Sequence, residues 1–458
     1  MESLSSSALF TWGANSHGQL GHAHVEDMYE PRVAQCAFPT EGLRALCGGG
    51  GHSALVTEAG QLLVCGQNDR GQLGLGHTSE ITTFCLSLSL AQCFVRQVSC
   101  GWDFTLILTG EGQVLACGSN TYGQLGLPHV SGHTAEPLQL QTLKEDVLCV
   151  AAGLRHALAV TRPGRVYQWG TGLSSQAKRA LTPKVIPKHL TSREPCLVPG
   201  LDHVTSWRVV AGSAHCVCLT TGGDLFLWGS NKQGQLCSAG LFVPQPSLLD
   251  RACMGGETIT DVWSGWTHLL AKTETGRVFS WGRSDYGQLG RAVSAKQSPS
   301  VQSGDTLAVD SRPTACNPVQ VEALAGARQI ACGSEHSLAI VGNHLLSWGW
   351  NEHGMCGDGS CMEVPRPSPI ALLQDNTPLL IGCGAGHSMA LCAGVAVTLT
   401  GAPEEASSKH DANNATHQPS QKIQSTVGTS CNKGQETHCF TAELDCDIIV
   451  PELLTLDQ

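Results

Sequence analysis

The segment Trp281-Gly282-Arg283-Ser284-Asp285-Tyr286-Gly287-Gln288-Leu289-Gly290 is one copy of a phrase that recurs over roughly the first 390 residues. Its opening pair, Trp-Gly, is found at five positions, and in two further copies Cys replaces Trp. The seven positions are Trp12, Cys65, Cys117, Trp169, Trp228, Trp281 and Trp348. Successive copies are 52 to 67 residues apart. A repeat of this length is typical of solenoids, propellers and arrays.

A second motif, a small residue followed by Gly-x-x-His, alternates with the first. It supplies a histidine in six copies and a phenylalanine in one: His52, Phe104, His156, His215, His268, His336 and His387. Five copies of the Trp-Gly motif also carry Gly-Gln-Leu six residues after the Trp or Cys. The copy at Trp348 reads Gly354-Met355-Cys356 at that place, and the copy at Trp169 loses the pattern.

Each repeat can be divided into four short strands. The first follows a proline, as in Pro183-Lys184-Val185-Ile186, and the second ends in small residues, as in Val95-Arg96-Gln97-Val98-Ser99-Cys100-Gly101. The third begins at the repeat histidine and the fourth ends at Trp-Gly, with a late glycine in the turn between them that fits a positive φ. Four antiparallel strands per repeat, arranged radially, make a propeller blade.

The two ends of the repeat region determine the number of blades. Leu9-Phe10-Thr11-Trp12 is a fourth strand without a third before it, and His387-Ser388-Met389-Ala390-Leu391 is a third strand without a fourth after it. We therefore predict an all-β, seven-bladed propeller over residues 8–392, closed by pairing of N- and C-terminal strands. Residues 1–7 are a polar leader, and residues 393–458 are of low complexity and predicted to be disordered.

Composition limits the partners and the compartment. The formal net charge is −11 and there is no basic arm, so we expect no direct nucleic-acid partner. Cys65 and Cys117 replace Trp, which indicates small buried hydrophobes rather than disulfides. Without a signal peptide or a membrane-length apolar run, we expect a soluble monomer with no membrane insertion, in the cytoplasm and also in the nucleus.

Two segments interrupt the repeat. Thr171 to Arg179 replaces the regular turn after Trp169-Gly170, and Ser294 to Gln320 is rich in Ser, Pro and Gly with little apolar content. The second segment is either a tolerated surface insertion or a loop for binding or phosphorylation.

The sequence contains no constellation typical of covalent catalysis. The six repeat histidines are one per blade and therefore far apart, which favours a structural role, each imidazole bonding the loop backbone of its own or the next blade, over a metal site. Gly48-Gly49-Gly50-Gly51 lacks the Lys and the βαβ context of a phosphate loop. We expect no cofactor, no metal and no covalent chemistry.

The two positions before each repeat histidine depart most from the consensus. They are predicted to line one rim of the ring, and we take the six that carry aromatic, charged or threonine side chains as candidate partner-binding residues: Trp102, Asp103, Arg155, Trp266, Thr267 and Glu335. This composition is typical of protein-binding surfaces. The alternative for each Trp, including the extra Trp350, is packing against a neighbouring blade.

The repeat, with Trp-Gly-x-Asn-x-x-Gly-Gln-Leu-Gly and Gly-x-x-His-Ser/Thr, resembles the regulator of chromosome condensation family over some 385 residues. The founding member is an exchange factor for the small GTPase Ran, and its exchange face uses polar residues in the loops before the repeat histidine. The resemblance implies that role for Asp103 first, then for Arg155, Thr267 and Glu335. The founding member's wedge in its third blade has no counterpart after Cys117-Gly118, and its basic N-terminal arm is missing.

Four segments are most similar to a branch of this family that is linked to regulated secretion, among them Cys100-Gly101-Trp102-Asp103 and Ser264-Gly265-Trp266-Thr267. This resemblance implies a small GTPase and a subunit of the exocyst tethering complex as partners. The expected function is guanine nucleotide exchange through one rim of the propeller. The alternative is a non-catalytic scaffold that binds a GTPase or an exocyst component.

Overall fold

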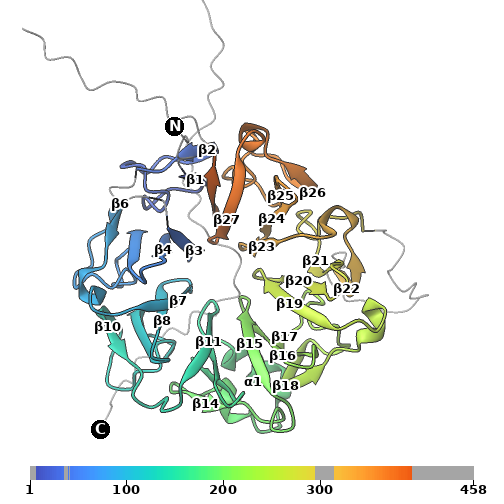
Figure 1. The fold of residues 1–458 in the computed structure, drawn as a ribbon. Helices are drawn as coiled ribbons and strands as arrows, with labels where there is room; N and C mark the ends of the chain where they lie inside the picture. The colour runs from blue at the N-terminus through green and yellow to red at the C-terminus, as the bar shows by residue number, and fades with distance from the viewer. Residues whose placement is uncertain (1–6, 36–39, 41, 294–313, 395–458) are drawn as a thin grey trace, which may run out of the picture. The chain divides into compact units, whose positions relative to one another are not determined.

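The computed structural model describes residues 7–35, 40, 42–293 and 314–394. These residues form seven four-stranded antiparallel sheets around a central axis, with one strand of each sheet innermost (Figure 1). The prediction of a seven-bladed β-propeller closed by both termini is confirmed.

We number the blades along the chain and give their strands from the axis outward. Blade 1 is β27 (Thr377–Cys383), β28 (His387–Ala393), β1 (Ser7–Gly13) and β2 (Met28–Val33), and blade 2 is β3 (Leu43–Gly48), β4 (His52–Thr57), β5 (Leu62–Gly66) and β6 (Ile81–Leu86). Blade 3 is β7 (Val95–Cys100), β8 (Phe104–Thr109), β9 (Val114–Ser119) and β10 (His133–Gln139), and blade 4 is β11 (Val147–Ala152), β12 (Ala157–Thr161), β13 (Val166–Trp169) and β14 (Cys196–Leu197).

The remaining blades follow the same order. Blade 5 is β15 (Ser206–Ala211), β16 (His215–Thr220), β17 (Leu225–Ser230) and β18 (Phe242–Leu248); blade 6 is β19 (Ile259–Ser264), β20 (His268–Thr273), β21 (Val278–Arg283) and β22 (Thr314–Gln320); blade 7 is β23 (Gln329–Cys332), β24 (His336–Val341), β25 (His344–Gly349) and β26 (Val364–Pro369). Short 3-10 turns lie outside the sheets: η1 (Leu88–Leu90), η2 (Lys188–Leu190), η3 (Arg251–Met254), η5 (Glu322–Leu324) and η6 (Ala371–Leu373).

Blade 1 contains two strands from each end of the described chain. Strand β1 pairs with β28 over seven positions, from Ser7 opposite Ala393 to Gly13 opposite His387. The proline-containing strand β2 pairs with β1 on the outside. Each proline strand thus belongs to the sheet of the Trp-Gly strand before it. The sequence-based prediction placed the proline strand first in its repeat, in one sheet with the three strands that follow it. This prediction is wrong, because the proline strand is the last and outermost strand of the preceding sheet.

The Trp-Gly and Gly-Gln-Leu motifs contact each other between blades. The indole Nε1–H of Trp281 donates to the carbonyl of Gln235 in the preceding blade (3.0 Å), and Trp12, Trp169 and Trp348 make the equivalent bond. Where Cys replaces Trp, the thiol of Cys65 donates to the carbonyl of Gln19 (3.4 Å). Both replacement cysteines are buried, which confirms their prediction as small core residues.

The repeat histidines also join neighbouring blades. In five of them, Nε2 lies within hydrogen-bond distance of a hydroxyl group in the next blade, as for His52 and Thr105 (2.9 Å). These five histidines therefore have the predicted structural role. Their side-chain partner is a Ser or Thr hydroxyl, whereas the sequence had suggested loop backbone.

Blade 4 differs from the prediction. Pro183 to Ile186 forms turn and irregular backbone rather than a strand, and the outer strand is the two-residue β14. The irregular segment after Trp169 forms the α-helix α1 (Ser174–Leu181), which buries Ala177 against the core between blades 4 and 5.

Parts of the remaining predictions lie outside the described residues. These are most of the leader, residues 294–313 of the second insertion, and the tail from residue 395; Thr314–Gln320 forms β22. Among the described residues, no helix has the length and apolar character needed to cross a membrane.

Candidate partner-binding face

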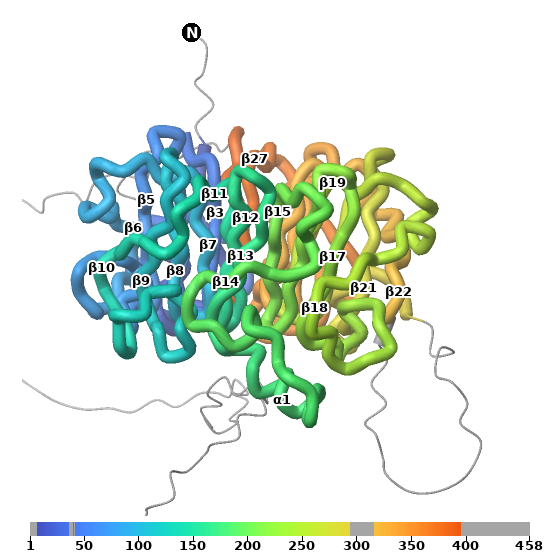
Figure 2. Tube along the Cα trace, turned by 90° about the horizontal axis from the view of Figure 1, so that it is seen from below, coloured from blue at the N-terminus to red at the C-terminus, as the bar shows by residue number. Residues whose placement is uncertain are grey.

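One end of the propeller carries the loops before the repeat histidines, which contain the six candidate residues. In each blade, the strand that begins at the repeat histidine runs antiparallel to the strand that ends at Trp-Gly. The loop before the histidine and the turn after Trp-Gly therefore lie at the same end of the blade. Helix α1 follows β13 and projects from this end (Figure 2). We call this end the α1 face.

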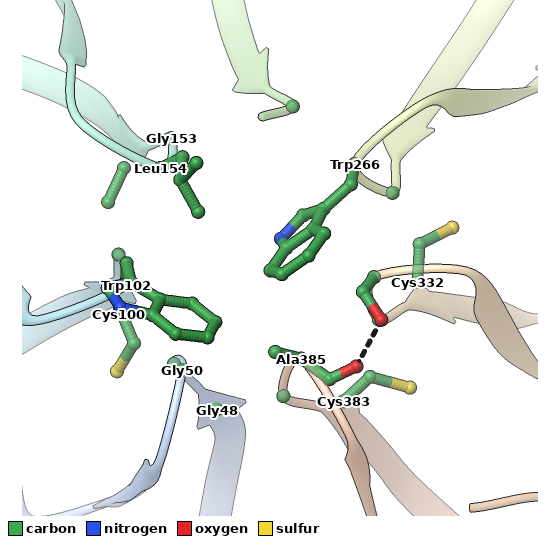
Figure 3. Close-up of a pocket in the computed structure, with 18 of the residues that line it drawn as sticks. Gly48, Gly50, Cys100, Trp102, Gly153, Leu154, Trp266, Cys332, Cys383 and Ala385 are labelled. Atoms are coloured by element: carbon green, nitrogen blue, oxygen red, sulfur yellow. Dashed lines mark hydrogen bonds between the residues drawn. The ribbon is translucent and has the colours of Figure 1, made fainter. Parts of the chain in front are cut away.

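The first of the two variable loop positions points toward the axis. A cavity of about 100 Å³ there is lined by all seven blades, with Trp102, Leu154, Trp266 and Ala385 among its lining residues (Figure 3). The rings of Trp102 and Trp266 contact each other with centroids 5.5 Å apart. The two tryptophans thus meet across the end of the axis, and the cavity is smaller than the roughly 300–1,000 Å³ of a small-molecule site.

Backbone hydrogen bonds connect most of these loops to one another. The N–H of Trp266 donates to Ser334 (2.8 Å), Ser334 to Ala385 (3.1 Å), and equivalent bonds continue to blades 2 and 3. Among the described residues, the N–H groups of Trp102 and Leu154 make no such bond to the next loop. The chain of backbone bonds between the loops nearest the axis is therefore interrupted from blade 3 to blade 5, although the outer turns of blades 3 and 4 are joined by the N–H of Thr171, which donates to the carbonyl of Tyr122 (2.8 Å).

The second variable position faces the surrounding turns. The amide Nε2 of Gln124 lies 3.3 Å from Oδ1 of Asp103, and the guanidinium of Arg155 lies over the ring of Tyr122, 4.5 Å from its centroid. Burial raises the pKa of Asp103, although hydrogen bonds from Ser119 and Gln124 and the positive charge of Arg155 act in the opposite direction. Asp103 and Arg155 form one electrostatically coupled pair.

Thr267 and Glu335 form a second pair between blades 6 and 7. The hydroxyl of Thr267 donates to Oε1 of Glu335 (2.6 Å), and Nε2 of Gln288 donates to Oε2 (2.9 Å). The guanidinium of Arg283 lies 3.7 Å from the same carboxylate, which is 5% exposed. A buried carboxylate is stable in a protein when charges and donors surround it in this way.

The charge of Glu335 reaches the repeat histidine of blade 6. Burial alone would lower the pKa of His268, but hydrogen bonding and charge at Cys332 and Glu335 raise that pKa to about 9. Nδ1 of His268 lies 3.8 Å from Oε2 of Glu335. In contrast, burial lowers the pKa of His215 to about 3.

The six predicted residues thus form three contacting or coupled pairs on one face: Trp102 with Trp266, Asp103 with Arg155, and Thr267 with Glu335. Sequence reasoning missed the residues that hold them, namely Tyr122, Gln124, Arg283 and Gln288. The repeated Gly-Gln-Leu motif could have indicated the two glutamines, since Gln124 follows Cys117-Gly118 and Gln288 follows Trp281-Gly282 at the same spacing. Among the described residues, no group of three or more His, Cys, Asp or Glu is placed to hold a metal ion.

The extra tryptophan lies on the same face. The ring of Trp350 is 6.1 Å from that of Tyr286 in blade 6 and 6.0 Å from that of His353. Nδ1 of His353 lies 2.8 Å from Oδ2 of Asp27 in blade 1. The packing alternative therefore holds for Trp350, which is partly buried between turns of neighbouring blades.

A seven-bladed ring of these repeats with a variable loop face defines a class of β-propeller proteins, and comparison with known proteins gives the family. The family model described as the RCC1-like domain matches residues 8–390. The chain belongs to this family.

Particular relatives are similar over most of their length. The chain is 50% identical over 394 residues to the mouse protein named secretion-regulating guanine nucleotide exchange factor, covering 85% of each chain. It is also 50% identical to the protein of that name from Bos taurus, over 84% of this chain and 83% of the relative.

A solved structure shows the same fold. Prp20p from Saccharomyces cerevisiae, described with its binding to Gsp1p and histones, matches with a TM-score of 0.70 and 24% identity, over 86% of this chain and 93% of that one.

Proposed function

We propose that this protein is a guanine nucleotide exchange factor for a small GTPase, linked to regulated secretion, and that it acts through the α1 face. The observation that carries this proposal is the 50% identity, over 85% of both chains, to a protein named for that activity. The three residue pairs on the α1 face support the choice of surface.

Exchange of this kind requires no covalent chemistry. The factor binds the nucleotide-free GTPase more tightly than the loaded form, and by linkage it lowers the affinity of the GTPase for its nucleotide. Asp103 and Arg155 directly follow Trp102 and Leu154, whose N–H groups make no backbone bond to the next loop among the described residues. We assign them to contacts made with the nucleotide-free form.

The test is release of a fluorescent guanine nucleotide from purified small GTPases with and without the protein. Asp103→Ala is expected to abolish the acceleration, and Arg155→Ala to reduce it at least tenfold, the effect of losing about 1.4 kcal/mol of binding to the exchange intermediate. Asp146→Ala, an exposed aspartate at the end away from the α1 face, is the matched control and should leave release unchanged. A flat response of every GTPase to the wild-type protein would disprove exchange.

A non-catalytic scaffold is the second candidate, and one observation favours it. Asp103 and Glu335 already bond to Gln124 and Gln288 within the ring, so both carboxylates can serve to hold the rim in shape. In this case the face binds a GTPase or an exocyst subunit without changing nucleotide release. Equal affinity for loaded and nucleotide-free GTPase, together with direct binding of a purified exocyst subunit, would establish the scaffold.

We also propose that the protein acts in the cytoplasm, with a second pool in the nucleus. Imaging of the tagged full chain tests this proposal, and exclusive enrichment in another compartment would contradict it.

A further inference from the structure

Positive charge is concentrated in one segment of an acidic chain. Residues 147–193 contain eight Lys and Arg and no Asp or Glu, although the whole chain has a net charge of −11. Two of the eight, Arg162 and Arg165, lie away from the α1 face and pair with Asp146 and Glu145. The other six belong to the α1 face: Arg155, Lys178, Arg179, Lys184, Lys188 and Arg193. Together with Lys232 from blade 5, they form what we call the basic sector.

The basic sector is open to solvent. The side chains of Lys178, Lys184 and Lys188 are exposed, and Val185 between them is 93% exposed. The α1-face segments of blades 4 and 5 carry one carboxylate, Glu194. Since α1 projects from the ring, these charges are at the part of the face that meets a partner first (Figure 2).

The other side of the same face is acidic. The turns after the Trp-Gly strands of blades 7, 1 and 2 carry seven carboxylates and a single guanidinium, that of Arg70. These carboxylates form the acidic sector: Glu26, Asp27, Asp69, Glu80, Glu352, Asp358 and Glu363. Blades 7, 1 and 2 lie across the axis from blades 4 and 5 (Figure 1). The α1 face is therefore electrostatically two-sided.

We propose that the basic sector docks an acidic surface of a protein partner. A broad anionic surface, such as a lipid bilayer or a nucleic-acid duplex laid over the face, would also meet the repulsive acidic sector. In contrast, a folded protein with a small acidic patch can contact the lysines of the basic sector without approaching the acidic sector. Fields of this kind steer encounter and fix orientation, and they raise association rates by about 10- to 1,000-fold.

A labelled polyglutamate peptide is the probe, measured by fluorescence anisotropy with the full chain. The charge-reversal variant Lys178→Glu/Lys184→Glu is expected to bind it at least about tenfold more weakly than wild type, with a smaller salt dependence. The matched control Lys144→Glu/Arg162→Glu makes the same change in net charge away from the α1 face, at exposed side chains, and should bind like wild type. In the wild-type protein, carbodiimide coupling should join peptide carboxylates to Lys178, Lys184 or Lys188.

Equal loss of binding in both variants, or coupling spread over other lysines, would overturn the proposal. Tighter binding of phosphatidylserine vesicles or of duplex DNA than of the peptide, lost in Lys178→Glu/Lys184→Glu, would instead assign the sector to a membrane or a nucleic acid.

This inference goes beyond nucleotide exchange and can be separated from it. If the wild-type protein accelerates no GTPase but binds the peptide through Lys178 and Lys184, the exchange function fails and the docking surface remains. If exchange occurs and is equally fast in the charge-reversal variant, while peptide binding is lost, the acidic partner is a protein other than the GTPase.

Discussion

The position immediately before the repeat histidine has a different chemistry in different blades. In blades 3, 4, 6 and 7 this position is occupied by Asp103, Arg155, Thr267 and Glu335. Each was visible in the sequence as a departure from the small residues at this position in the other blades. Their pairing was not predictable, because a repeat places residues at equivalent positions but does not give the distance between blades. The buried environment of Glu335 depends on Arg283, which the repeat pattern does not mark.

Replacing Glu335 tests this local electrostatics. In Glu335→Gln, the pKa of His268 should fall well below its value of about 9, because the carboxylate no longer favours the imidazolium. The free energy of unfolding should fall by about 1–3 kcal/mol as charge-assisted hydrogen bonds are lost. NMR titration of the His268 ring proton measures the first effect. Glu352→Gln, at an exposed glutamate of blade 7, is the control, and an unchanged His268 pKa in Glu335→Gln would contradict the account.

Each blade is joined to the next by the Trp-Gly strand. The sequence was sufficient to predict the blades because Trp, Gly-Gln-Leu and the repeat histidine all make contacts between neighbouring blades. Each of these motifs therefore recurs once in most blades. The pairing of the proline strands was wrong because their exposed residues carry no pattern that distinguishes the sheet before from the sheet after. Helix α1 was missed because its eight residues are too few for a helical period.

Two substitutions at Trp281 separate packing from hydrogen bonding at this joint. Trp281→Phe removes the indole N–H bond to Gln235 and should cost about 1–3 kcal/mol, whereas Trp281→Ala also leaves a cavity and should cost about 3–5 kcal/mol. Urea unfolding monitored by circular dichroism measures both. Equal midpoints for the two variants would show that core packing at this position contributes little.

The whole ring depends on closure by β1. Removing residues 1–13 takes away β1, leaves β28 without its partner over seven positions and separates β2 from its sheet. We expect a large loss of cooperativity in unfolding and a larger hydrodynamic radius, measured by scattering-coupled chromatography. A chain lacking only residues 1–6 is the control, and a compact, cooperative product without β1 would contradict closure as the main constraint.

The whole propeller should become less stable as the pH falls below neutrality. Burial lowers the pKa to about 4 in His52 and His156 and to about 3 in His215, His336 and His387. In the unfolded chain these histidines have their ordinary pKa of 6.5 and bind protons below that pH, whereas in the folded chain they stay neutral. The free energy of unfolding therefore falls as the pH drops from about 6.5 toward 4. His268 acts oppositely and adds stability that is lost as pH rises through about 9.

Thermal melts between pH 7 and pH 4.5 should therefore show a decreasing Tm. His156→Phe copies the Phe104 of blade 3 and removes one fully buried imidazole. The His156→Phe variant should fold, and its Tm should decrease less between pH 7 and pH 4.5 than the Tm of the wild type. An identical pH dependence in the two proteins would exclude His156 as a source of the effect.

We propose that the α1 face recognises the nucleotide-free state of a small GTPase. The most direct measurement is the affinity of the wild-type protein for the nucleotide-free and the GDP-loaded forms of each purified GTPase, by calorimetry or interferometry. We predict that one GTPase binds at least tenfold more tightly without nucleotide, a difference of about 1.4 kcal/mol, and that Asp103→Ala removes this preference. Equal affinity for the two forms, or no binding to either, would contradict it.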